Sequence, residues 1–220
     1  MKAALLALAL VLAALPACSQ PGAAADPVLQ VDFNNPSLTP SHWTLTVHPD
    51  GSGHFRSERG SAPVVTPQSL DAPNVDREIH LNAEFAQRLF QTAHQHNWAG
   101  AECESRAKVA FEGWKKISYS GPEGHGLCEF NYAQDKQMQA LGDSFVSVAA
   151  TILEGARLEM LLLHDRLGLD AELRYLTEAA KDGRVQQICA IRGILQRLAE
   201  DDSVMERVRR HARALLAKGQ

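Results

Sequence analysis

Histidine and cysteine are the residue types here that could most readily bind a metal or catalyse a reaction, and the chain has nine His and four Cys. Cysteine-based zinc sites commonly contain a Cys-x-x-Cys pair, and this sequence has none. His94 and His96 would lie about 200° apart around a helix, so we expect exposed side chains that do not share an ion. His48 and His54 flank a predicted hairpin turn, where we expect both to be solvated. Because the Gly-x-Ser-x-Gly, His-Glu-x-x-His and phosphate-loop motifs are also missing, we predict no metal site, no cofactor and no catalytic residue.

The N-terminal residues indicate export from the cytoplasm. Lys2 is followed by an apolar run over residues 3–14 and by Leu15-Pro16-Ala17-Cys18, a pattern typical of a secretory signal. The run is too short for a membrane-spanning helix, which needs about 20 residues. The cysteine after Leu-x-Ala resembles the lipobox of bacterial lipoproteins. This resemblance covers residues 1–18 alone and implies cleavage before Cys18, acylation of Cys18 and a lipid-anchored envelope protein. Ser19 implies, in a diderm cell, the outer membrane facing the periplasm.

Two further cysteines are expected to form a disulfide. Exported proteins fold in oxidising compartments, and Cys103 and Cys128 flank a segment rich in predicted strands. Closing a loop of about 25 residues would stabilise the fold by roughly 3 kcal/mol in the chain-entropy model. Cys189 lies among apolar residues at helical spacing, so we predict a buried free thiol that packs as a small apolar side chain.

Composition indicates a folded protein and argues against nucleic acid as a partner. Apolar residues make up 45% of the chain and charged residues 22%, which is enough for a sizeable core. The formal net charge is −4, whereas nucleic-acid-binding proteins usually carry a basic stripe.

The sequence divides into four expected segments. Residues 1–17 form the signal peptide, and residues 18–41, rich in Pro, Gly and Ala, are expected to be the lipidated cysteine and a flexible tether. Within the tether, Val28–Phe33 could form a short strand. Residues 42–153 are expected to fold as an α+β domain, followed by an all-α helical segment over residues 154–220.

The expected α+β domain is an antiparallel sheet of about five to six strands with a packed helix. Asn82 is expected to cap that helix, whose apolar stripe includes Phe85 and Leu89. From Lys136 the apolar spacing is helical, which predicts a long helix between the sheet and the helical segment, bent at Gly155. Alternation and turn residues predict strands over residues 42–48, 53–59, 77–81, 106–111, 114–119 and 127–132.

The turn at Gly121–Gly126 is the best candidate for recognition. It is polar and rich in glycine, and the predicted disulfide lies nearby, so Glu123, Gly124 and His125 could present a fixed contact surface. His125 can gain a proton in mildly acidic solution. A plain solvated turn is the alternative. An aromatic group, Trp114, Tyr119, Phe130 and Tyr132, is expected on one sheet face packed under a helix.

These features favour a protein- or peptide-binding adaptor held at the membrane by its lipid. The predicted order of hairpin, strand, helix and hairpin is similar to small antiparallel-sheet protease inhibitors such as the emfourin and cystatin types, and this implies protease inhibition as an alternative. A third alternative is an envelope enzyme that uses dispersed residues.

Overall fold

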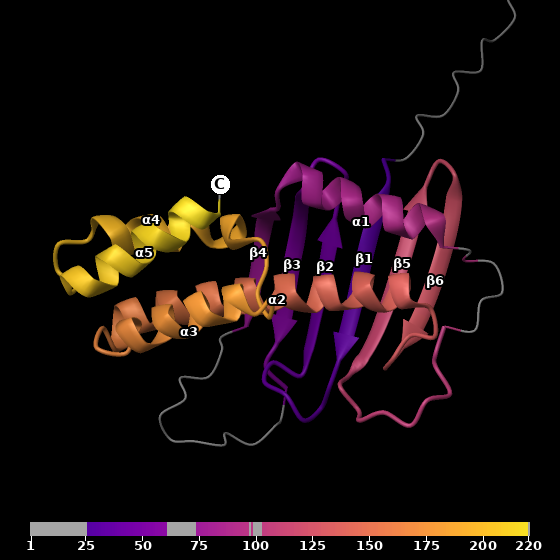
Figure 1. Ribbon diagram of the computed structural model, residues 1–220, viewed down its shortest axis with the longest axis horizontal. Helices are drawn as coiled ribbons and strands as arrows, with labels where there is room; N and C mark the ends of the chain where they lie inside the picture. The colour runs from indigo at the N-terminus through magenta and orange to yellow at the C-terminus, as the bar shows by residue number, and fades with distance from the viewer. Residues whose placement is uncertain (1–25, 61–73, 97, 99–102, 220) are drawn as a thin grey trace, which may run out of the picture.

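The computed structural model describes residues 26–60, 74–96, 98 and 103–219, so the expected signal peptide and the predicted acylation site Cys18 lie outside the described residues. The fold is α+β, with an open sheet and a C-terminal helical region (Figure 1). The strands are β1 (Val28–Asn34), β2 (His42–Val47), β3 (Ser52–Glu58), β4 (Val75–His80), β5 (Trp114–Gly121) and β6 (Gly124–Phe130). The helices are α1 (Ala83–Gln95), α2 (Lys136–His164), α3 (Leu169–Lys181), the short η1 (Ile188–Ile191), α4 (Arg192–Glu200) and α5 (Glu206–Lys218).

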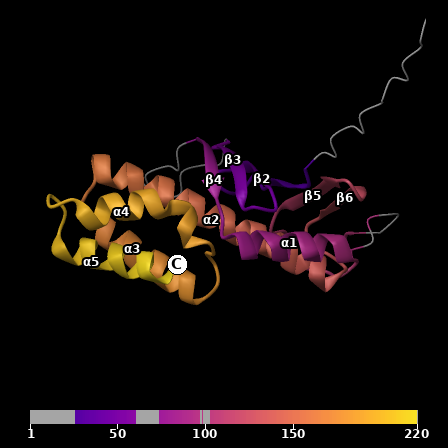
Figure 2. The ribbon, with the colours of Figure 1, turned by 90° about the horizontal axis from the view of Figure 1, so that it is seen from above.

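The six strands form one antiparallel sheet in the order β4-β3-β2-β1-β5-β6. One face is apolar because side chains alternate along each strand and the registers align the apolar ones. Val31, for example, lies opposite Leu45 on one side and Ile117 on the other, and all three are fully buried. Helices α1 and α2 both cross this face (Figure 2). The other face is polar, as is common for antiparallel sheets with one solvated side.

The expected flexible tether is wrong for residues 28–34, which form β1 near the middle of the sheet. Leu29, Val31 and Phe33 are at most 4% exposed and belong to the main core. The flanking Pro, Gly and Ala residues suggested a linker, but the partner of β1 on one side is β5, which is far away in the sequence. The folded domain therefore begins before the expected boundary at residue 42.

The expected strand over residues 106–111 is also absent, and this segment is an irregular loop. Its backbone does not pair with a strand. Instead, the Asn131 side chain accepts hydrogen bonds from the backbone N–H groups of Glu112 (2.7 Å) and Gly113 (3.2 Å) and donates one to the Ala110 carbonyl (3.1 Å). A single buried amide thus replaces a strand partner.

Helix α2 is one continuous helix of 29 residues that passes through two apolar cores. Its first part, up to Ala156, packs in the sheet core, and its last part, from Leu158, packs against α3, α4 and α5. Gly155 lies at this change. A Cβ atom there would come within 2.3 Å of the Ile191 side chain, so the glycine allows η1 to approach α2 closely.

The two cores are also joined by polar contacts. Arg77 of β4 forms a two-pronged ion pair with Glu159 of α2, with N–O distances of 3.2 and 2.8 Å. Within the helical region, Arg157 donates to Glu172 at 2.7 Å. Among the described helices, none is both long and apolar enough to cross a bilayer.

Candidate functional site

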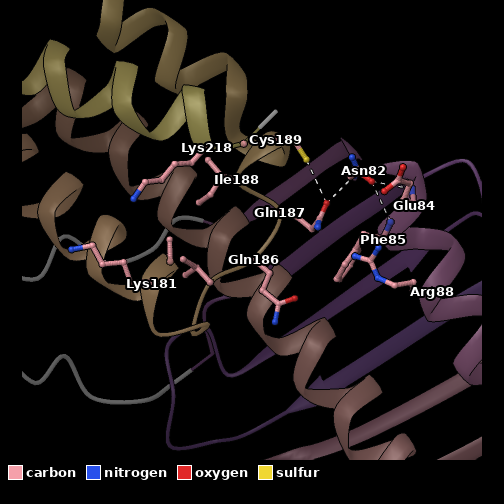
Figure 3. Close-up of a pocket in the computed structure, with 13 residues that line it drawn as sticks. Asn82, Glu84, Phe85, Arg88, Lys181, Gln186, Gln187, Ile188, Cys189 and Lys218 are labelled. Atoms are coloured by element: carbon pink, nitrogen blue, oxygen red, sulfur yellow. Dashed lines mark hydrogen bonds between the residues drawn. The ribbon is translucent and has the colours of Figure 1, made fainter.

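A cleft of about 510 Å³ opens where the sheet meets the helical region (Figure 3). Its walls come from the start of α1, the end of α3, the segment leading into η1 and the end of α5. Asn82, Glu84 and Arg88 lie on one side, and Lys181 and Lys218 lie on the other (Figure 3). The segments that form these walls are far apart in the sequence and come together only in the folded protein.

Gln187 joins the two sides of this cleft. Its side-chain Oε1 accepts a hydrogen bond from the backbone N–H of Asn82 at 2.9 Å and lies 3.5 Å from the Sγ of Cys189. Its backbone is in the left-handed region, with φ 59° and ψ 54°, which non-glycine residues adopt rarely. Asn82 in turn caps α1 through bonds from the backbone N–H groups of Glu84 and Phe85. This contact therefore joins the start of α1 to the segment that leads into η1.

Cys189 is partly exposed in this cleft and not buried as expected. Its Sγ lies 3.8 Å from the carbonyl oxygen of His80, at the end of the edge strand β4. The helical spacing predicted burial, but η1 is a short 3-10 helix and leaves the thiol at the surface of the cleft. Of the two lysines, Lys181 lies in the last turn of α3 and Lys218 in the last turn of α5. Lysines at these positions commonly stabilise helix ends. We find no nucleophile with an adjacent base among the described lining residues.

A second concave region, of about 350 Å³, contains Lys115 and Asp143. Lys115 is 2% exposed, and its ammonium donates to the Asn131 carbonyl at 2.8 Å. Burial lowers the pKa of Lys115, and burial also raises the pKa of Asp143. Because the ammonium is bonded to the main chain and lies over the Phe130 ring, its role in this geometry is to hold the strand ends together.

The predicted recognition turn joins β5 to β6 and is held in place from α1. We call residues 121–126 the tip. Its Glu123 carboxylate lies 3.3 Å from His94 Nδ1, and His94 Nε2 lies 2.9 Å from the Tyr119 hydroxyl. Burial, and then the charge of Glu123, raises the pKa of Tyr119, so the phenol keeps its proton. The His94 ring thus lies between the Tyr119 hydroxyl and the Glu123 carboxylate, while His125 is exposed.

His94 is thus a positioning residue for the tip, which the sequence did not indicate. The expected exposure of His94 at the helix end is confirmed, but its partners come from the hairpin of β5 and β6, well beyond α1 in the sequence. No local signal could have found this role, because both partners lie in the distant β5–β6 hairpin. The glycines of the tip also differ in role: a Cβ on Gly126 would overlap Trp98, whereas Gly124 has open space but a φ of +127°.

The predicted disulfide between Cys103 and Cys128 is present. It ties the segment that follows α1 to the edge strand β6. Among the described residues, one group of three potential metal ligands is close together, and it consists of these two sulfurs and His96. Since both sulfurs are bonded to each other, they are not available as thiolate ligands.

The expected placement of the aromatic group is corrected. Tyr119 and Phe130 are buried under the helices, whereas Trp114 and Tyr132 are exposed, so the four aromatic residues do not share one covered face. Trp114 is on the polar face because it is one residue out of phase with the buried Lys115. His54, which was expected to be solvated, is partly exposed on the same polar face. Its Nε2 atom lies 2.8 Å from the Oδ1 atom of Asp76 on the neighbouring strand β4.

Comparison with known proteins does not assign this site. No protein-family model matches the chain, and no curated protein matches it.

Proposed function

We propose that this chain is a lipid-anchored cell-envelope protein that acts by binding a protein or peptide, with the tip as its contact. Acylation of Cys18 would hold it at the membrane, which in a diderm cell would be the outer membrane facing the periplasm. The observation that carries the proposal is the position of β1: Val28 lies opposite Ser120, so the chain enters the sheet directly beside the tip.

The proposed anchor would keep the tip near the bilayer. Eight peptide steps separate Cys18 from Asp26, and a fully extended chain of that length spans at most about 27 Å. With β1 included in the sheet, the tether is much shorter than the segment 18–41 that composition predicted. The proposed partner of the tip is therefore a protein or peptide at the membrane surface.

The tip is suited to binding because its shape is already held in place. Two strands flank it, and the chain of contacts from Tyr119 through His94 to Glu123 connects it to α1. A contact surface ordered before binding loses less conformational entropy when a partner arrives. Glu123 remains 65% exposed at its side chain, so it can still meet a partner.

The test replaces the exposed polar side chains of the tip and keeps Gly124. The variant is Glu123→Ser with His125→Ser, and its matched control is Glu129→Ser with His164→Ser, which removes the same residue types elsewhere. A photo-crosslinking amino acid at position 120 is activated in intact cells, and the adducts are identified by mass spectrometry. We expect a discrete protein adduct that is lost in the tip variant and retained in the control.

Equal adduct yield from both folded variants would contradict the tip as the contact. A protease as the adduct would favour the inhibitor alternative over a general adaptor. Circular dichroism of the purified variants separates a lost contact from a lost fold.

A further inference from the structure

The end of the sheet opposite the tip carries a cluster of exposed apolar side chains. β1 ends and β5 begins there, with Asn34 opposite Trp114, and β6 ends beside them (Figure 1). Of the nine exposed large apolar side chains among the described residues, five lie at this end. We call them the aromatic surface: Leu38, Val109, Phe111, Trp114 and Tyr132. Such a concentration commonly marks a protein or membrane contact.

The loop that carries Val109 and Phe111 and leads into Trp114 is held by buried side chains. Asn131 bonds three backbone groups of this loop, and the Asn35 side chain donates to the Glu112 carbonyl at 3.0 Å. Asn35 and Asn131 are 5% and 7% exposed. Because the backbone is fixed from below, Phe111 and Trp114 stay at the surface, with their rings 6.3 Å apart. Apolar side chains held outward in this way are already placed for a partner.

The segment that carries this loop is basic, unlike the chain as a whole. Residues 104–116 contain four basic and two acidic residues, whereas the chain has a net charge of −4. Lys115 is buried, so three of the four basic residues are at the surface. Lys108 and Lys116 are exposed. The Glu104 carboxylate accepts hydrogen bonds from the backbone N–H groups of Asn131 and Tyr132. The other acids nearby are Glu112 and Asp135, which are exposed, and Asp32 and Glu129, which lie opposite Lys116 on the two neighbouring strands.

We propose that the aromatic surface binds an anionic lipid bilayer, with Phe111 and Trp114 in the headgroup region and Lys108 and Lys116 facing lipid phosphates. Tryptophan is favoured at membrane interfaces because its ring is apolar and its N–H can stay hydrated. Exposed lysines beside such rings are attracted to anionic headgroups. The combination of rings and lysines therefore fits an anionic lipid surface better than an uncharged apolar partner.

This contact is separate from the proposed lipid anchor and does not depend on it. β1 has seven residues, so six steps separate its two ends, which are about 20 Å apart. A tether that spans up to about 27 Å could therefore let both ends of the sheet reach one bilayer. With both contacts made, the strands would lie along the membrane plane, and the tip would stay at its surface.

The test uses the full chain with Cys18→Ser, which cannot be acylated. Sedimentation with vesicles of two parts phosphatidylcholine to one part phosphatidylglycerol is compared with sedimentation with pure phosphatidylcholine. We expect binding to the anionic vesicles, and a loss of at least fivefold in affinity for Phe111→Ser with Trp114→Ser. The matched control, Leu163→Ser with Leu167→Ser, removes two side chains that are 70% and 79% exposed on the helical region, and it should bind like the parent.

Two double variants that replace basic residues with glutamate complete the test. Lys108→Glu with Lys116→Glu should abolish binding to anionic vesicles, whereas Arg192→Glu with Arg210→Glu should weaken it by less than twofold. Trp114 is the most exposed described tryptophan in this region, and the parent's fluorescence should shift to shorter wavelengths with vesicles. No binding by the parent, or equal losses in variants and controls, would overturn the proposal; an acidic protein bound in place of vesicles would also overturn it. Since no acyl chain is present, these outcomes do not bear on the anchor or the tip.

Discussion

The carboxyl pair between α2 and α3 makes a prediction about stability and pH. Glu154 of α2 is hydrogen-bonded to Glu172 of α3, and the Oε2 atom of Glu154 is buried without another partner in the described structure. Burial, then the hydrogen bond and the charge of Glu172, raises the pKa of Glu154 to about 8, against an opposing effect of Arg157. Glu154 therefore holds a proton at neutral pH.

The sign of the effect follows from proton binding. Between pH 4.5 and 8 the folded protein keeps the proton on Glu154 while the unfolded chain releases it, so the free energy of unfolding falls as pH rises. A shift of this size corresponds to about 5 kcal/mol for a group that titrates alone. Because Glu172 shares the proton and solvent reaches part of the pair, we expect about 2–3 kcal/mol.

The variant Glu154→Gln, which resembles the protonated acid at all pH values, isolates this contribution. Urea unfolding followed by circular dichroism at pH 5, 7 and 8.5 should show the variant within about 1 kcal/mol of the parent at pH 5 and about 2–3 kcal/mol more stable at pH 8.5. Glu200→Gln, an exposed glutamate at the end of α4, should leave the parent's pH dependence unchanged. If the parent and Glu154→Gln lose stability equally between pH 5 and 8.5, the proton is not on Glu154 and the reasoning is refuted.

Three further predictions concern the anchor, the thiols and the core. Mass spectrometry of the mature protein should find an acylated Cys18 as the first residue, and an unmodified N-terminus elsewhere would contradict the lipobox assignment. Without reductant, native alkylation should modify Cys189 slowly, because it is partly exposed, and should not modify Cys103 or Cys128; labelling of either would argue against the disulfide. Phe145→Asp should destabilise the fold by roughly 4 kcal/mol or more, because Phe145 is fully buried and the charge would have no partner; Phe145→Leu, as the control, should cost less in thermal melts, and equal losses would show that the core is misplaced.

Local signals were sufficient for several elements of the fold. Trp43, Leu45 and Val47 alternate with polar residues and form β2, because alternation places every second side chain on the core face. The turn after β2 contains Asp50 and Gly51, and Gly51 adopts a φ of +86°, as its lack of a Cβ permits. Asn82 caps α1 as predicted, since an N-cap acts only on the next few backbone N–H groups.

Elements that depend on distant partners were not apparent in the sequence. β1 is central because β5 pairs with it. The loop over residues 106–111 does not pair as a strand, and the Asn131 side chain bonds Ala110 and Gly113 at its end. Gly155 was expected to bend α2, but it makes room for Ile191. In each case the deciding contact joins residues far apart in the chain, where local periodicity carries no information.

The candidate sites likewise include features that the sequence indicates and features that depend on the tertiary structure. The sequence alone indicated which residues would carry the proposed signals for export and acylation, which cysteines could pair, and which turn is polar and glycine-rich, because each of these patterns consists of residue types that can be read without the fold. Only the tertiary structure decided that His94 holds the tip, that Cys189 faces a cleft, and that five apolar side chains gather at the opposite end of the sheet. The physical reason is that exposure, hydrogen bonding and charge depend on what surrounds a side chain in space, and chain folding brings those surroundings together from segments that no single stretch of sequence contains.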